Sequence, residues 1–154
     1  MRRSAATLLL VFTLCLTTLG PLARQPAARA DDTQPANAFF QQTWERTDLP
    51  VAEGRATRSW VWGPAPFSGA LGETYQEAPG GVRLVQYYDK SRMEINDPAA
   101  DTSEVWYVTN GLLAKELMSG SMQLGDNTFD QRNPAAVNIA GDPDDPDGPT
   151  YASF

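Results

Sequence analysis

The sequence predicts a small, single α+β domain, in which an N-terminal aromatic helix and a short C-terminal helix pack on an antiparallel sheet centred on a β-hairpin. Three observations predict this class. Apolar residues recur at helical spacing around Phe40, two alternating segments flank a polar turn after Tyr88, and a second helical pattern ends at Gly120. The chain has 154 residues, which is enough for one hydrophobic core.

Residues 1–30 have the three-part layout of a secretory signal peptide. Two arginines precede an apolar run at 7–19, and Ala28-Arg29-Ala30 offers the small residues that a signal peptidase recognises. The run is shorter than the ~20 residues that a membrane span requires. We therefore expect a protein that is secreted, extracellular or associated with the cell envelope, with no membrane partner after cleavage.

The lead-in at 31–37 is polar and contains a proline, so we expect it to be flexible and to precede a domain at 38–140. A short helix is predicted at 38–46, because its apolar residues fall on one face. Leu49-Pro50-Val51 is expected to end it, since a residue before proline avoids helical angles. The apolar residues are Phe39, Phe40 and Trp44.

Three strand signals follow. Residues 59–63 predict a short strand with Trp60 and Trp62 on one face, because side chains alternate along a strand. The clearest element is a β-hairpin at 82–95, in which two alternating segments surround a short polar turn. Residues 104–109 are β-branched and aromatic and predict a third strand.

The last elements are short. Residues 112–119 predict a helix with two leucines one turn apart and Gly120 as its stop. Residues 122–124 and 136–139 are expected to be edge strands. Residues 141–154 are rich in aspartate, proline and glycine, so we expect an acidic linker or tail.

Composition excludes several classes of function. Removing residues 1–30 takes away four of the 12 basic residues and the only cysteine, Cys15, and leaves 19 acidic residues against eight basic ones, a net charge of −11. Such a surface repels phosphate backbones, so no nucleic-acid partner is expected. Without histidine or cysteine the chain has no Ser-His-Asp or Cys-His catalysis and no ordinary zinc site, so we expect no cofactor.

Four stretches carry a resemblance to known proteins. The segments FQQTW (40–44), Leu49-Pro50-Val51, VQYYDKSRME (85–94) and NGLLAKEL (110–117) resemble a repeat of uncharacterised secreted bacterial proteins, which is loosely similar to repeats in wall-associated proteins. The likeness covers 38–120, but the connection before the hairpin is longer than usual. The resemblance implies a secreted, repeat-like, non-catalytic module and brings no catalytic residues.

The aromatic residues have two interpretations. Rings fill the core of a small domain without disulfides, or an exposed row of rings stacks on sugars. Seven are dense enough to consider, and alternation places neighbours in the hairpin on opposite faces. The hairpin charges suggest a solvated edge, a polar-ligand contact or cross-strand pairing. The candidate binding residues are Trp60, Trp62, Tyr87, Tyr88 and Arg92.

Acidic residues suggest two further hypotheses. Two carboxyl groups about 5 to 9.5 Å apart hydrolyse a glycan in many enzymes, but no spacing here singles out a pair. The aspartates at 142–147 suggest calcium, yet an EF-type loop would place Pro143 at its first position and Phe154 at its twelfth, so no metal site is expected. The carboxylates considered are Glu73, Glu77, Asp89, Glu94, Glu104 and Glu116.

The leading interpretation is a secreted, non-catalytic module for extracellular or cell-envelope association, with a cell-wall glycan or another extracellular protein domain as its partner. One alternative is a carboxylate-dependent glycan hydrolase. The other is a structural spacer or repeat that supports a downstream domain. The three hypotheses differ in what they require, namely an exposed binding surface, two acids in one cleft, or neither.

Overall fold

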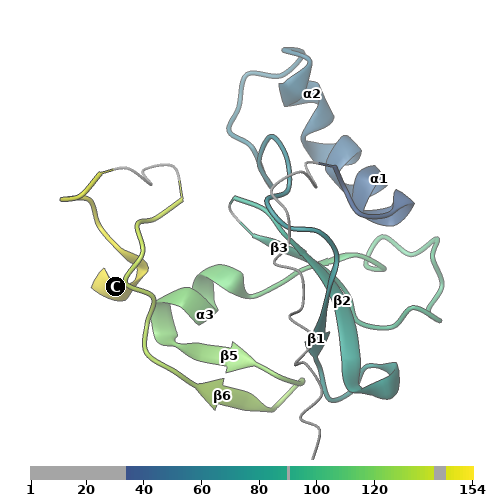
Figure 1. Cartoon of the computed structure of the whole chain (residues 1–154). Coiled ribbons are helices and arrows are strands. Elements are labelled where there is room, and N and C mark those ends of the chain that lie inside the picture. Colours follow the sequence, from purple (N-terminus) through teal and green to yellow (C-terminus); the bar gives the residue numbers. More distant parts are fainter. Residues whose placement is uncertain (1–33, 90, 141–144) are drawn as a thin grey trace, which may run out of the picture.

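The computed structural model describes residues 34–89, 91–140 and 145–154. Three α-helices, a four-stranded antiparallel sheet in the order β1-β2-β3-β4 and a two-stranded sheet β5-β6 make up the described chain, which confirms the α+β class (Figure 1). The helices are α1 (Ala38–Thr47), α2 (Leu49–Ala52) and α3 (Leu113–Ser119), the strands are β1 (Leu71–Thr74), β2 (Val82–Tyr87), β3 (Arg92–Ile95), β4 (Thr109–Asn110), β5 (Ser121–Gln123) and β6 (Phe129–Gln131), and η1 (Pro79–Gly81) and η2 (Tyr151–Ser153) are 3-10 turns.

Helix α1 confirms the prediction at 38–46. Asn37 begins it, because its side-chain oxygen accepts hydrogen bonds from the amides of Phe39 and Phe40, each 2.9 Å long. Helix α1 ends at Thr47, just before Leu49-Pro50-Val51 as expected, but these three residues are themselves helical. Pro50 lies in the first turn of α2, where a helix needs no amide donor, so a second short helix starts there.

The strand predicted at 59–63 is wrong, because a buried carboxylate takes its amides. Asp48, at the end of α1, accepts hydrogen bonds from the amides of Val61 (2.9 Å), Trp62 (2.7 Å) and Gly63 (3.2 Å). Asp48 is fully buried. Amides that point at one side chain cannot pair with a neighbouring strand, so this segment is an irregular loop.

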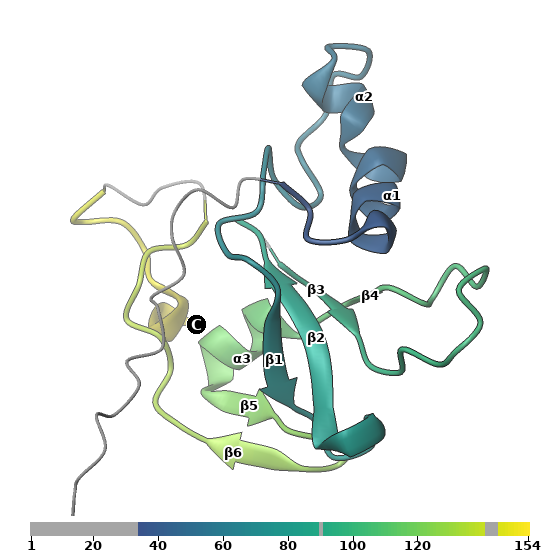
Figure 2. The ribbon, with the colours of Figure 1, turned by 45° about the vertical axis from the view of Figure 1, so that its right-hand side comes forward.

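The predicted hairpin is confirmed as β2 and β3. Its register pairs Tyr87 with Arg92 and Val85 with Glu94, so these four residues share one face of the sheet. The opposite face carries the apolar residues and packs against α1 (Figure 2). This core consists of Phe40, Trp62, Tyr88, Met93, Ile95 and Val108.

The other face lies under α3 and the β5-β6 pair (Figures 1 and 2). The helix predicted at 112–119 is confirmed, and Gly120 ends it with a positive φ of 71°. A side chain at Gly120 would overlap the carbonyl oxygen of Arg132, the residue that follows β6. The edge strand predicted at 122–124 is confirmed as β5 with shifted bounds, whereas β1 and β6 were not predicted.

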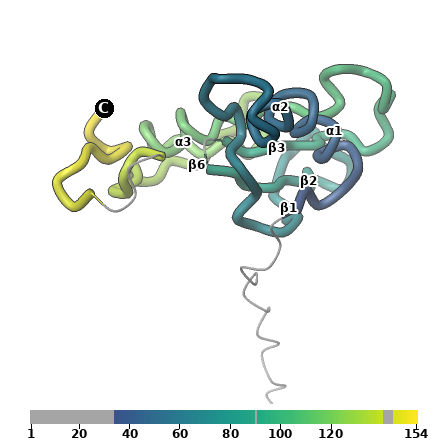
Figure 3. Tube along the Cα trace, turned by 90° about the horizontal axis from the view of Figure 1, so that it is seen from above, coloured from purple at the N-terminus to yellow at the C-terminus, as the bar shows by residue number. Residues whose placement is uncertain are grey.

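The strand predicted at 104–109 is wrong for most of its length. Only Thr109 belongs to β4, and 101–107 form consecutive turns in which the amides of Glu104 and Tyr107 donate to the carbonyls of Asp101 and Glu104. These turns project the segment away from the sheet, and it lies beside α1 (Figure 3). Trp106 is consequently 76% exposed, although the composition of the segment 104–109 is typical of a strand.

The C-terminal residues lie back against the domain. The strand predicted at 136–139 is wrong, since only a single bridge joins Asn138 to Thr150. Backbone hydrogen bonds from Tyr151 to Val137 (3.1 Å) and from Ala152 to Ala135 hold the described end of the predicted tail in place. Among the residues that the structure describes, no helix is long and apolar enough to span a membrane. The predicted leader at 1–30 lies outside the described residues.

Candidate functional site

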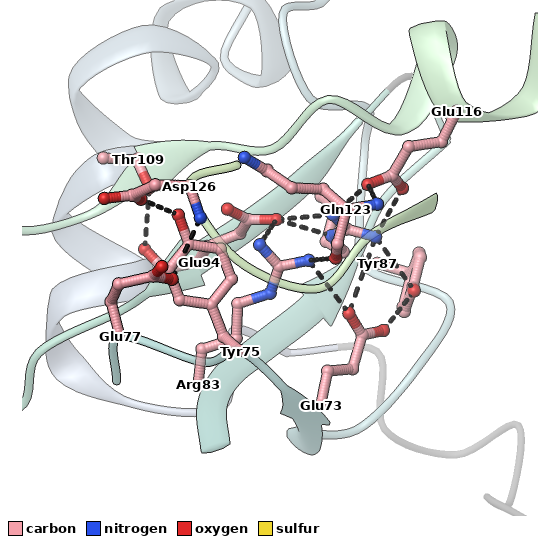
Figure 4. Close-up of polar contacts among 11 residues, drawn as sticks. Glu73, Tyr75, Glu77, Arg83, Tyr87, Glu94, Thr109, Glu116, Gln123 and Asp126 are labelled. Atoms are coloured by element: carbon pink, nitrogen blue, oxygen red, sulfur yellow. Dashed lines mark hydrogen bonds and ion pairs between the residues drawn. The ribbon is translucent and has the colours of Figure 1, made fainter. Parts of the chain in front are cut away.

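A cluster of buried charges that includes Arg83, Glu94 and Glu116 occupies the α3 side of the sheet (Figure 4). Arg92 forms ion pairs with three of its carboxylates. Arg92 Nη2 lies 2.6 Å from Glu94 Oε1, and Arg92 Nη1 lies 2.9 Å from Glu116 Oε2 on α3. Burial lowers the pKa of Arg92, but the hydrogen bond with Glu116 and the charge of Glu94 outweigh it and raise the pKa. Arg92 therefore stays charged and joins α3 to the sheet.

Arg83 is the second cation of this cluster. Strand register places it opposite Glu73, and Arg83 Nη2 lies 3.5 Å from Glu73 Oε2. Arg83 Nη1 lies 3.2 Å from Glu94 Oε1 in an ion pair without the alignment of a hydrogen bond. The guanidinium also lies 4.7 Å from the centre of the Tyr75 ring and donates to the Gln123 carbonyl on β5. Arg83 thus ties β5 to the same face.

Three carboxylates balance the two arginines. Burial raises the pKa of Glu94, although Arg92 and Arg83 act in the opposite direction. The Tyr87 hydroxyl donates to Glu73 and accepts from Arg92 Nη1 at 3.3 Å. The prediction of a solvated edge for the hairpin charges is wrong for Arg92 and Glu94, which are buried, Arg92 with a partner on α3 in Glu116. Asp89 is exposed, and Lys90 lies outside the described residues. We conclude that the cluster positions elements, while Arg92 and Glu116 also line a hollow of about 280 Å³ beside it.

An open groove lies next to this cluster. It has a volume of about 380 Å³ and runs between β2, α3 and the C-terminal segment. Phe67 is 65% exposed at its edge, and its ring centre is 6.1 Å from that of Tyr87. A second hollow of about 280 Å³ shares the Tyr87, Leu113 and Leu117 walls. We call the first hollow the α3 groove and define it by Phe67, Tyr87, Leu113, Leu117, Ile139 and Tyr151.

The structure separates the predicted binding residues. Trp62 and Tyr88 are buried in the core, where their ring centres are 5.8 Å apart, so the prediction that their rings contact a ligand is wrong for this conformation. Tyr88 is nevertheless among the residues around the α3 groove, but it has no exposed surface there. Alternation from Tyr87 turns Tyr88 toward α1. Trp60 is half-buried and stacks on Trp44 at 6.5 Å. No single surface combines the four predicted rings.

Two predicted residues do come together, Tyr87 and Arg92. The Arg92 guanidinium lies 5.6 Å from the centre of the Tyr87 ring, and Tyr87 also lines the α3 groove. Sequence reasoning missed Phe67 and Tyr151, which complete the groove. Phe67 stands alone in a loop rich in glycine and proline, and Tyr151 follows the acidic run, so neither belongs to a periodic pattern.

Carboxylates do not converge in the hollows of the described chain. The 280 Å³ hollow, the α3 groove and a 180 Å³ cleft beside α1 are lined by one acid each, namely Glu116, Asp89 and Glu104. Glu116 is also bound by Arg92. These hollows therefore give no support to the hydrolase hypothesis.

The described residues give no support to the calcium hypothesis either. Asp142 and Asp144 lie outside the described residues, and the amides of Asp147 and Gly148 donate to Asp145, which forms a turn. Within the described part of the chain, no group of three acidic side chains is placed to hold a metal ion.

The fold and the site thus define an α+β protein with one apolar sheet face, one charged sheet face and an open aromatic groove at the edge of the charged face. No protein-family model, no curated protein and no solved structure matches the chain.

Proposed function

We propose that this protein is a secreted, non-catalytic module that associates with the cell envelope by binding another extracellular protein domain through the α3 groove. The observation that carries the proposal is the exposure of Phe67 beside Tyr87, at the edge of a 380 Å³ hollow. Contiguous exposed apolar surface on a small protein marks an interaction site.

The lining of the groove favours apolar side chains of a protein over a sugar. Leu113, Leu117 and Ile139 offer aliphatic carbon, which cannot satisfy the hydroxyl groups of a sugar. An apolar side chain loses its hydration shell in such a groove and gains close contacts. The partner class that fits is therefore a peptide segment with at least one large apolar residue.

The charged cluster makes the groove rigid. The Tyr87 hydroxyl is held between Glu73 and Arg92, and the Arg92–Glu116 ion pair holds α3 at the opposite wall. When a partner binds a preformed groove, the free-energy cost of ordering the side chains of the groove is small. This supports a binding role over a spacer role, because a spacer needs no preformed hollow.

Location rests on the sequence. The leader at 1–30 and the resemblance of 38–120 to a repeat of uncharacterised secreted bacterial proteins both support export. The acidic balance supports a protein partner, since a net charge of −7 for the whole chain disfavours nucleic acid.

Retention on isolated cell envelopes tests the proposal. We expect the purified wild-type protein to be retained and Phe67→Ala to lose about tenfold or more of its affinity, as for an aromatic anchor. Phe129→Ala is the matched control, because Phe129 is also exposed (46%) but lies on β6, outside the groove.

Treatment of the envelopes separates the partner classes. Protease treatment is expected to abolish the difference in retention between wild type and Phe67→Ala, whereas removal of polysaccharide leaves this difference. Equal retention of wild type, Phe67→Ala and Phe129→Ala would contradict a role for the groove, and a difference that survives protease would contradict a protein partner.

A further inference from the structure

The loop at 101–107 projects beside α1 (Figure 3). A third hollow lies between this loop and α1. Its volume is about 180 Å³. We propose that this hollow, the α1 cleft, binds one uncharged sugar unit of an extracellular polysaccharide. The α1 cleft shares no residue with the α3 groove, so the inference adds a second ligand to the proposed function.

The walls of the α1 cleft are polar and hold two opposite charges. Arg46 lies on α1, whereas Glu104 lies on the projecting loop. Within the described part of the chain, neither forms an ion pair with another residue. A guanidinium only donates and a carboxylate only accepts, while each sugar hydroxyl does both. The two walls thus suit neighbouring hydroxyls, together with the side chains of Gln42, Thr102 and Ser103.

Aromatic rings line the same cleft. Phe39 and Tyr107 meet edge to face, with ring centres 4.7 Å apart and planes 64° apart. The C–H face of a sugar ring is apolar and packs on such rings, while its hydroxyls reach the polar walls. Trp106 lies between two residues of the cleft, Val105 and Tyr107, and its exposed indole offers a surface to the next unit of a polysaccharide.

The size and charge of the α1 cleft restrict the class of ligand further. A volume of 180 Å³ is below the roughly 300–1,000 Å³ of pockets for drug-sized ligands, which limits the cleft to one small unit. Among the residues that the structure describes, Arg46 and Glu104 are the only charged ones that line it, so the charge of the cleft itself is balanced. The acidic chain around it repels anionic sugars. An uncharged sugar unit meets all of these conditions.

The loop is held in its shape before any ligand arrives. The amide and hydroxyl of Ser103 donate to Asp101 Oδ1 at 2.9 and 2.7 Å, and the amide of Glu104 donates to the Asp101 carbonyl at 3.1 Å. The Tyr107 hydroxyl donates to the Pro98 carbonyl at 3.4 Å. Binding therefore requires little ordering of the protein, which favours affinity for a small ligand.

Titration of the purified protein with glucose and with N-acetylglucosamine tests the inference, read by amide NMR shifts. We expect saturable shifts at 39–46 and 102–108. Arg46→Ala and Glu104→Gln are each expected to weaken binding by about tenfold, the effect of losing a hydrogen bond to a charged group. Arg55→Ala is the matched control, because this exposed arginine lies outside the cleft.

A further variant and further ligands test the class of ligand and the length of the site. Trp106→Ala, a change at a largely exposed position that the fold tolerates, is expected to weaken binding of a trisaccharide and to leave that of the monosaccharide unchanged. No saturable shift at the cleft with either sugar, or equal affinity in Arg46→Ala, Glu104→Gln and wild type, would overturn the inference. Tighter binding of glucuronate than of glucose would overturn the uncharged class.

One more variant separates this inference from the proposed function. Phe67→Ala alters the α3 groove and is expected to leave sugar binding unchanged. Loss of sugar binding in Phe67→Ala would overturn the independence of the two sites. Intact sugar binding together with unchanged envelope retention in Phe67→Ala contradicts the proposed function alone.

Discussion

Replacing Arg92 by methionine tests whether the charged cluster holds the fold together. Methionine keeps much of the length of the side chain but removes the charge. The change leaves Glu94 and Glu116, which are 4% and 8% exposed, without their closest cation. Breaking a buried ion pair from one side costs about 3–5 kcal/mol, because the remaining charge stays buried and unpaired.

That cost is large for a domain of this size. A small domain has about 5–15 kcal/mol of folding free energy, so Arg92→Met is expected to remove a third or more of it. Urea unfolding followed by tryptophan fluorescence measures the loss, with Trp62 in the core as the reporter. Arg132→Met is the control, because the Arg132–Asp130 pair is exposed and is worth at most about 1 kcal/mol.

A double variant separates charge from packing. In Arg92→Met with Glu116→Gln, one of the unpaired carboxylates is gone, so the combined loss is expected to be smaller than the sum of the two single losses by about 0.5–3 kcal/mol. A loss under about 1 kcal/mol for Arg92→Met, no greater than that of Arg132→Met, would refute the reasoning. Additive single losses would show that the two residues act independently.

Two further predictions concern the same face of the sheet. Gly111→Ala is expected to destabilise the protein by about 1–3 kcal/mol in urea unfolding, because the new methyl group would overlap Glu94 Oε1 and lie 3.0 Å from Arg92 Nε. Burial and the hydrogen bond to Asp126 raise the pKa of Tyr75 to about 12. The folded protein holds the Tyr75 proton more tightly than the unfolded chain, so the protonated hydroxyl adds to the free energy of unfolding below pH 10, and this contribution is lost between pH 10 and 12. Tyr75→Phe is expected to reduce this alkaline loss of stability.

Each of these predictions has a clear contrary result. An unchanged urea midpoint in Gly111→Ala would mean that α3 shifts freely over the sheet. That result would contradict the idea that the charged cluster holds α3 in a fixed position. For Tyr75→Phe, unfolding curves at pH 9 and at pH 12 give the stability change for both proteins. An equal loss in wild type and variant would show that Tyr75 keeps its ordinary pKa in the folded state.

The elements that sequence predicts well are those whose signal is local. The alternation on either side of Asp89 fixes the hairpin, and the helical spacing before Gly120 fixes α3. Asn37 begins α1 through hydrogen bonds that span only three residues. In each case the residues that stabilise the element lie within it or beside it, so their pattern can be read directly.

The failed strand predictions depend on hydrogen bonds that the composition of the segment does not reveal. Residues 59–63 have the composition of a strand, but Asp48, more than ten residues earlier, takes their amides. Trp106 lies in a β-branched and aromatic segment, yet consecutive turns starting at Asp101 carry it into solvent. Composition describes a preference of the segment, which a tertiary hydrogen bond overrides at 59–63 and local turn hydrogen bonds override at 104–108.

The candidate site was predictable in its residues but not in its environment. Tyr87 and Arg92 were selected from the hairpin, and their cross-strand pairing brings them together. Their burial depends on α3, since Glu116 supplies the carboxylate that compensates Arg92. A charged residue in a sequence reads as exposed unless its partner is known, and this partner lies 24 residues away on another element.

The two faces of the sheet constrain their cover in different ways. Apolar contacts between α1 and the core are non-directional, so they tolerate small shifts of the helix. The cover on the charged face must place Glu116 Oε2 within hydrogen-bond distance of Arg92 Nη1 and the Gln123 amide within reach of Glu116, or buried charges lose their partners. Because α3 is also one wall of the α3 groove, the charge cluster sets the width of that groove. Loss of the cluster is therefore expected to impair partner binding even where the chain still folds.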